Sequence, residues 1–339
     1  MESRVIGLEI ANSSIKAFTV SDKTLEPKLV YCPNTIREVN YSEIDSLLTG
    51  GKTFYTIGKK QWEIGIPNAV GTGGKERDYT SEEFTAQVIC SITKLVEYET
   101  EEIYLVYGLP ATSADNKTFI EQLNKLKGKH EVYENKRKRS FEIKAIKVIS
   151  QPIGTLFYLT YDLNGNSKGF LDPKLLYMFI DGGWGTVDPV IVSLHGGIVR
   201  TDTINYGMSD YNSLLREMMS KKSPSVRTLY KSLYDFDIAV REGILTIRGG
   251  EVKIKDYQKE IETIQNELSQ KIYYQLSNDG WDFASCNKII LTGGLFATLF
   301  DATKKVFGKD YSNDIILVDD PITANVKGYY TFGRKHFHI

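Results

Sequence analysis

The sequence lacks the features that mark several large classes of protein. Its 339 residues contain three cysteines, with no Cys-x-x-Cys pair and no histidine at metal-ligand spacing, so neither a disulfide framework nor a zinc site is expected. Charge of one sign is not in excess either, because 42 Lys and Arg stand against 43 Asp and Glu. A protein that binds duplex DNA directly normally carries a strong basic excess, and we therefore expect no direct contact with nucleic acid.

Long hydrophobic runs are also missing. The longest apolar stretch, Leu175 to Ile180, is far shorter than the ~20 residues that a membrane-spanning helix needs. The first ten residues, MESRVIGLEI, have no charged segment followed by an apolar core and a cleavage site, as a secretory signal would. These absences predict a soluble, cytoplasmic protein with no membrane partner.

What is present is a globular composition, with 41% hydrophobic and 25% charged residues. A chain of this length is expected to form two domains, and strand-like stretches broken by glycine alternate with charged helical stretches, which predicts an α/β fold. We expect a first domain over 1–150, with an insertion at about 33–79, completed by the C-terminal residues 322–339. The second domain is expected over 151–321, with a helical insertion at about 211–280.

Two helix starts can be predicted from local sequence. Thr80-Ser81-Glu82-Glu83 has the spacing of a capping box, with the Thr80 hydroxyl and the Glu83 carboxylate satisfying each other's free amides. Pro152 disfavours helix at the preceding Gln151, so a helix is expected over Ile153 to Tyr161.

One unit occurs twice along the chain. The strands Val5–Ile10 and Ile15–Val20 flank a short polar turn, and a strand ending in Asp181 is followed by a glycine turn and a returning strand. The backbone amides of such a turn can bind phosphate oxygens, and the carboxylate can hold Mg²⁺ through its waters. A third strand breaks into Gly293-Gly294, where the absence of Cβ atoms lets a flat adenosine lie against the backbone.

In their order along the chain, these segments resemble the motifs of the actin/Hsp70/sugar-kinase ATPase superfamily, and within it those of the bacterial ParM (StbA) group of plasmid-segregating actins. The first phosphate motif, Asp-x-Gly-Asn-Gly-x-x-Lys, is similar to Glu9–Lys16, and the second, Asp-x-Gly-x-Gly-Thr, to Asp181–Thr186. Further similarities are Gln151–Leu156, Thr292–Gly294, Tyr107–Pro110, Asn205–Gly207 and Asn325–Tyr329.

The resemblance implies an actin-like (ribonuclease H-like) fold of two similar domains around a nucleotide cleft, with ATP or GTP and Mg²⁺ as ligands. Glu9 and Asp181 would hold the metal through water, and Gln151 would orient the attacking water as the third catalytic residue. Lys16 would neutralise charge on the β- and γ-phosphates. The residues implied to contact the nucleotide are Asn12, Ser13, Ser14, Lys16, Gly183, Trp184, Gly185, Thr186, Gly207, Thr292, Gly293, Gly294 and Leu295.

The chain departs from the family pattern at four positions. Glu9 replaces the first aspartate, Ala11 and Ser13 replace two glycines, and Leu295 replaces a small residue in the adenosine motif. If the family glycines have positive φ, then Ala11 and Ser13 must adopt another turn or accept strain.

As a function, the resemblance implies an ATPase that polymerises with ATP into filaments and segregates plasmid DNA through a DNA-binding adaptor. The alternatives are a small-molecule kinase of the same superfamily and a non-hydrolysing structural actin homologue. A kinase would need an acidic general base, for which Asp188 is the best candidate near the phosphate motifs. Glu9 and Ala11 are the residues that favour the non-hydrolysing homologue.

Overall fold

The computed structural model of the chain describes residues 2–21, 24–40, 52–66, 78–97, 100–195, 197–247, 250–311 and 315–339. The chain forms two compact units, one made of Met1–Phe170 with Asn325–Ile339 and the other of Leu171–Ala324. The first unit therefore continues to residue 170 rather than ending at 150. The reason is that helix α4 (Gln151–Thr160) packs on the first unit's sheet and its Gly154 touches the C-terminal segment at Tyr329.

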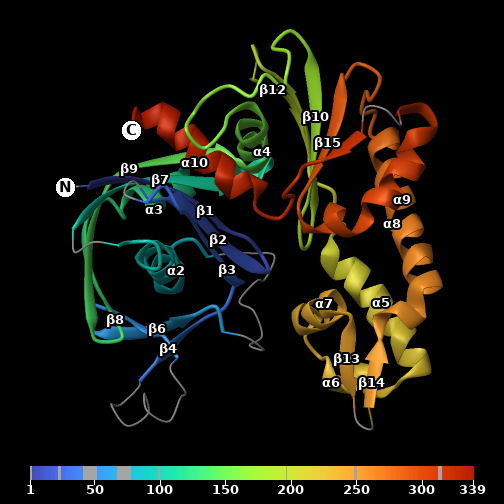
Figure 1. The fold of residues 1–339 in the computed structure, drawn as a ribbon, viewed down its shortest axis with the longest axis horizontal. Helices are drawn as coiled ribbons and strands as arrows, with labels where there is room; N and C mark the ends of the chain where they lie inside the picture. Colours follow the sequence, from blue (N-terminus) through green and yellow to red (C-terminus); the bar gives the residue numbers. More distant parts are fainter. Residues whose placement is uncertain are drawn as a thin grey trace. The chain divides into compact units, whose positions relative to one another are not determined.

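The first unit is built on a nine-stranded sheet that curls around helix α2 (Figure 1). Its strands run in the order β3-β2-β1-β7-β9-β8-β5-β6-β4, and β1, β7 and β9 are parallel to one another. Their bounds are β1 (Glu2–Ile10), β2 (Ser14–Val20), β3 (Pro27–Pro33), β4 (Ile36–Val39), β5 (Tyr55–Ile57), β6 (Lys60–Ile64), β7 (Glu101–Leu109), β8 (Gly128–Glu134) and β9 (Arg137–Ser150).

Helices cover both faces of this sheet, as the alternation along β1 requires. Ile6, Leu8 and Ile10 join the core with α2 (Glu82–Thr93) and α3 (Lys117–Asn124), while Val5 joins a second core with the C-terminal helix α10 (Ala324–Phe337). A short 3-10 turn, η1 (Ala111–Ser113), precedes α3. Of the expected insertion at 33–79, the described part forms β4–β6, which extend the sheet from β8, and 41–51 and 67–77 lie outside the described residues.

Both predicted helix starts need correction. The N-cap of α2 is Ser81 rather than Thr80, because the Thr80 hydroxyl donates to Asp78 and the Ser81 side chain accepts from the Phe84 amide. Helix α4 begins at Gln151 rather than at Ile153, with Pro152 in its first turn. Proline is tolerated there since first-turn amides have no partner within the helix.

The second unit is built on a five-stranded sheet in the order β12-β11-β10-β15-β16, with β10, β15 and β16 parallel. Its strands are β10 (Leu176–Gly182), β11 (Val187–Ser193), β12 (Gly197–Thr201), β15 (Lys288–Thr292) and β16 (Ile315–Leu317). Helix α9 (Gly294–Tyr311) packs on this sheet, and α8 (Gln258–Asn278) packs on α9.

The expected helical insertion at about 211–280 contains helices and one small hairpin (Figure 1). Its elements are α5 (Met208–Lys222), α6 (Ser225–Leu229), α7 (Leu233–Glu242), β13 (Ile244–Ile247), β14 (Gly250–Lys253), η2 (Ile254–Tyr257) and α8. Among the described residues we find no helix whose length and apolar character would let it span a bilayer.

Candidate functional site

In the first unit, the predicted site residues meet at the carboxyl ends of the parallel strands. Leu8 on β1 is level with Tyr107 on β7, and Leu109 at the end of β7 is level with Ser150 at the end of β9. Glu9, the Gly108-Leu109-Pro110 segment and Gln151 therefore reach the same edge of one sheet. Ligands of open α/β sheets bind at this edge, because the loops that leave parallel strands gather there.

Glu9 and Lys16 are direct partners across the first hairpin. They lie opposite each other on β1 and β2, and Lys16 Nζ is 2.8 Å from Glu9 Oε1. Glu9 is only 2% exposed, and its other oxygen accepts from the Tyr329 hydroxyl of α10 at 3.4 Å. A buried carboxylate needs such partners, because leaving it uncompensated costs several kcal/mol. The two charged residues of the first motif are thus ion-paired with each other in the structure.

The turn of this hairpin is closed without glycine. The Ala11 amide donates to the Ser14 carbonyl at 2.8 Å. Among the described residues other than glycine, only Leu25, Asn135 and His338 have positive φ, so Ala11 and Ser13 are not strained. Of the two possibilities that the sequence left open, the chain adopts a different turn.

Gln151 is the first residue of α4 and follows the last residue of β9. Within the described part of the chain its half-buried amide has no hydrogen-bond partner, and neither does the buried hydroxyl of Ser150. Buried polar groups are normally hydrogen-bonded, so these two groups at the end of a strand are ones that a water molecule or a ligand would satisfy.

In the second unit, Asp181 lies at the end of β10, level with Thr292 on β15 and with Asp188 on β11. The hairpin between β10 and β11 is closed by the Gly183 amide, which donates to the Thr186 carbonyl at 2.8 Å. Asp188 on β11 holds the hairpin further, because its two oxygens accept from the hydroxyls of Thr186 at 2.9 Å and Thr203 at 2.7 Å.

The environment of Asp188 does not suit a general base. Asp188 is 4% exposed, and burial raises the pKa of its carboxyl while the hydrogen bonds from Thr203 and Thr186 oppose that change. Because its two oxygens accept from Thr186 in the hairpin and from Thr203 beyond β12, its role is to hold the hairpin. The buried position of this aspartate could not be read from the sequence.

Gly207 places helix α5 directly against the second hairpin. The amides of Met208 and Ser209 donate to the carbonyls of Gly183 and Trp184 at 3.0 and 2.8 Å. A Cβ on Gly207 would collide with the Trp184 carbonyl, so only glycine permits this approach. Predicted residues that lie far apart in the sequence are here in contact.

The Thr292–Leu295 segment adjoins the same hairpin. Gly293 has φ +88°, and a Cβ there would collide with the Gly182 carbonyl and with Asp181. Gly294 is open, with a guanidinium nitrogen of Arg241 as the nearest atom, 3.7 Å from where a Cβ would be. The Leu295 side chain is fully buried in the core of the unit, so this residue can offer a ligand only its backbone.

Sequence reasoning missed several residues at these two edges. They are Asn34 and Gln87 in the first unit and Thr203 and Arg241 in the second. None of them is adjacent in sequence to the hairpin that it approaches, and no motif spacing points to them. Arg241 is oriented by Asp237, which accepts from its Nε at 2.9 Å and from Asn212 at 2.9 Å.

The two edges have the chemistry to bind Mg²⁺ and a phosphate-containing ligand. Magnesium prefers carboxylate and phosphate oxygens and keeps several waters, and the strand-end carboxylates Glu9 and Asp181 fit that preference. The described residues contain no group of three or more His, Cys, Asp or Glu side chains that could hold a metal on their own.

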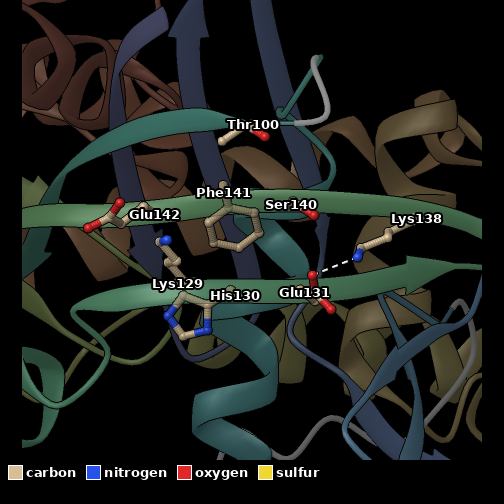
Figure 2. Close-up of a pocket in the computed structure, with 8 residues that line it drawn as sticks. All are labelled: Thr100, Lys129, His130, Glu131, Lys138, Ser140, Phe141 and Glu142. Carbon is tan, nitrogen blue, oxygen red and sulfur yellow. Dashed lines mark ion pairs between the residues drawn. The ribbon is translucent and has the colours of Figure 1, made fainter. Parts of the chain in front are cut away.

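A separate hollow of about 420 Å³ lies on the β8–β9 hairpin. Figure 2 shows His130 and Phe141, whose rings stack at 5.4 Å, and the ion pair between Lys138 and Glu131 at 2.6 Å. Phe141 is level with the start of β7, whereas Ser150 is level with its end. At ~3.3 Å per residue, the hollow is about 30 Å along β9 from Gln151 and does not belong to the candidate site.

Comparisons with known proteins agree with this fold. Residues 7–154 match the family model described as "Actin like proteins N terminal domain". A search of curated proteins finds no match to the chain. Among solved structures, the apo psk41 parM protein aligns with 18% identity and a TM-score of 0.74, over 100% of this chain and 99% of that one.

Two further structures are similar along their whole length. A ParM from a 15-stranded filament of Clostridium botulinum aligns with 19% identity and a TM-score of 0.74, covering 99% of this chain and 100% of that one. An archaeal actin homologue in complex with ADP aligns with 16% identity and a TM-score of 0.74, covering 98% and 99%. The actin-like resemblance and the actin-like fold of the chain are therefore confirmed.

Proposed function

We propose that this chain is an ATPase that assembles into filaments with ATP and segregates plasmid DNA through a DNA-binding adaptor. The observation that carries the proposal is the pair of phosphate-type hairpins in an actin-like fold, each next to a buried strand-end carboxylate, Glu9 or Asp181. The filament of the Clostridium botulinum ParM and the ADP complex of the archaeal homologue support it by analogy.

The first unit would bind the terminal phosphates. Amides and hydroxyls of Asn12, Ser13 and Ser14 are the donors of the hairpin, and Lys16 supplies its positive charge. In the structure Lys16 is paired with Glu9, so it would move from the carboxylate toward the phosphate oxygens when the nucleotide binds. Glu9 would then be left to hold water around Mg²⁺, which neutralises charge on the phosphates when bound.

Gln151 would act on the attacking water. Its amide can accept one water proton and donate to a phosphoryl oxygen, which orients the water without removing a proton outright. Its position at the end of β9, with no partner in the described part of the chain, suits that role. The unpaired Ser150 hydroxyl beside it is a second group that could hold the water.

The second unit would bind the rest of the nucleotide. Gly183, Trp184, Gly185 and Thr186 would contact phosphate oxygens from their backbone, with Asp181 holding water around the metal. Gly207 and the Thr292–Leu295 backbone would line the ribose and base. Arg241 lies beside Gly294 and would add a planar cation to that surface.

Filament growth requires two different complementary surfaces on each subunit, because a head-to-tail contact does not close on itself. ATP would favour the conformation in which these surfaces fit, and loss of the γ-phosphate would loosen them. The near-zero net charge lets subunits stack without strong repulsion and suits a protein that reaches DNA through an adaptor in the cytoplasm. A small-molecule kinase is disfavoured because Asp188, its best general base, is occupied by two threonines.

The proposal is tested by sedimentation and light scattering with ATP, with ADP and without nucleotide, together with phosphate release. We expect polymer with ATP and phosphate release that follows assembly. Asp181→Asn, which keeps the size of the side chain, should abolish both, whereas Asp301→Asn at an exposed position of α9 should change neither. No polymer under any nucleotide would rule out the filament function, and phosphate release without polymer would favour the kinase.

A further inference from the structure

The turn of the first phosphate hairpin is held by one buried residue, Asn34, from outside the hairpin. Asn34 follows the last residue of β3 and is 2% exposed. Its backbone N–H donates to the Ser13 carbonyl at 2.9 Å, and its side-chain Nδ2 donates to the Ala11 carbonyl at 2.7 Å. Two of the carbonyls in the turn are thus fixed by one residue from outside the hairpin.

The orientation of the Asn34 amide is itself determined by Gln87. Gln87 is on α2, is 4% exposed, and donates from Nε2 to Asn34 Oδ1 at 2.6 Å. Because this bond requires the oxygen of Asn34 to point toward α2, the amide nitrogen must point toward the hairpin. Gln87 therefore acts on the turn through Asn34.

Because peptide groups are planar, the contacts of Asn34 also determine which way the backbone N–H groups of the turn point. In a trans peptide the C=O of one residue and the N–H of the next point in opposite directions. With the Ala11 and Ser13 carbonyls directed at Asn34, the N–H groups of Asn12 and Ser14 point away from it. These are two of the donors assigned to the phosphates.

The Gln87–Asn34 pair, called the clamp below, holds a turn that contains no glycine. Where the resembling family has two glycines, this chain has Ala11 and Ser13, neither of which has positive φ. We infer that Asn34, oriented by Gln87, is a positioning residue that presents the first hairpin to the terminal phosphates of the nucleotide. This inference rests on the proposed nucleotide binding.

The sharpest test changes Gln87, which does not touch the hairpin. Gln87→Glu has the same shape but presents an acceptor to Asn34, so the Asn34 amide should flip and direct its oxygen at the Ala11 carbonyl. Calorimetric titration with ATP and with ADP, both with Mg²⁺, should show an ATP affinity about 10-fold lower or more, with a smaller loss for ADP. Gln122→Glu on α3, half-exposed next to Lys125, is the matched control and should leave both affinities unchanged.

Asn34→Ser is the second variant, in case a charge at residue 87 prevents folding. It removes the long amide and should produce the same selective loss of ATP affinity, with thermal unfolding measured on the same samples. If either variant folds and keeps the ATP-to-ADP affinity ratio of the wild type, the clamp is refuted. Equal losses for both nucleotides would also refute it, because they would indicate a merely structural role. Absence of nucleotide binding in the wild type would refute the proposed function instead.

Discussion

At the scale of single residues, buried polar side chains hold the two phosphate-type hairpins. Asn34 binds two carbonyls of the first, and Asp188 binds two hydroxyls next to the second. Both residues are almost fully buried. The hairpins are thus shaped before any ligand arrives, which reduces the entropy that binding would cost.

Asp188 has a pH-dependent effect on stability whose sign follows from its environment. Burial raises the pKa of its carboxyl above the value of 3.8 in an unfolded chain, against the opposing hydrogen bonds from Thr203 and Thr186. The folded state therefore holds this proton more tightly than the unfolded chain does. The stability that the protonated carboxyl contributes is lost as the pH rises through the folded pKa.

Asp188→Asn should remove that dependence. Its Oδ1 can accept from one threonine and its Nδ2 can donate to the other hydroxyl. We expect the stability of the variant relative to the wild type to rise between pH 4 and pH 7, measured by urea unfolding at several pH values. Asp188→Ala also lacks the carboxyl and should show the same pH dependence, but its stability should lie about 1–3 kcal/mol below that of the Asn variant at each pH, because both threonine hydroxyls lose their partner. A relative stability of the Asn variant that does not change with pH would contradict this account.

At the scale of elements, some helices are determined by local sequence and others by tertiary packing. Helix α2 is started by a local signal, the Ser81 side chain that accepts from the Phe84 amide. Helix α10 depends on long-range packing, because a Cβ on its Gly328 would collide with the Gly154 carbonyl of α4. The Tyr329 ring next to it occupies the space left by Gly108 and Gly154.

The cap of α2 can be tested by two neighbouring substitutions. Ser81→Ala removes the acceptor for a first-turn amide and should lower the free energy of unfolding by about 1 kcal/mol. Thr80→Ala removes a hydroxyl that only contacts the exposed Asp78 and should change it by less than about 0.5 kcal/mol. Chemical denaturation of both variants measures the difference. A larger loss of stability for Thr80→Ala than for Ser81→Ala would instead support Thr80 as the N-cap, as the sequence predicted.

At the scale of the whole molecule, the first unit is discontinuous in sequence. It is completed by Asn325–Ile339, whose Val326, Tyr329 and Tyr330 are buried in the same core as Val5 and Val106. The second unit is continuous, since Leu171–Ala324 contains all five strands of its sheet. The stability of the first unit therefore depends on the end of the chain.

Truncation after Ala324 should unfold the first unit. Each fully buried apolar or aromatic side chain contributes roughly 1.5–3 kcal/mol, so losing three removes an amount comparable with the ~5–15 kcal/mol that stabilises a typical domain. Hydrogen exchange in β1, in the middle of the sheet, should rise to the rate of an unfolded chain. Removal of only the last two residues should leave β1 protected, and protection of β1 after the longer truncation would contradict the dependence.

By itself the sequence determined the strands that carry the motifs and the two hairpins, and its resemblance to the actin superfamily implied the actin-like fold. The strands follow from apolar patterns, and the hairpins from motif residues that are close in sequence, such as Glu9 and Lys16. The start of α2 was missed by one residue, because the choice between Thr80 and Ser81 depends on which hydroxyl Asp78 engages.

Only the tertiary structure decided how the hairpins are held. Asn34 reaches Ala11 from another strand, Gln87 reaches Asn34 from a helix, and Tyr329 reaches Glu9 across more than 300 residues of sequence. The role of Asp188 also changed from a possible base to a buried hairpin support. Such contacts carry no local signal, because hydrogen bonds between side chains depend on distances that only the packing of whole elements sets.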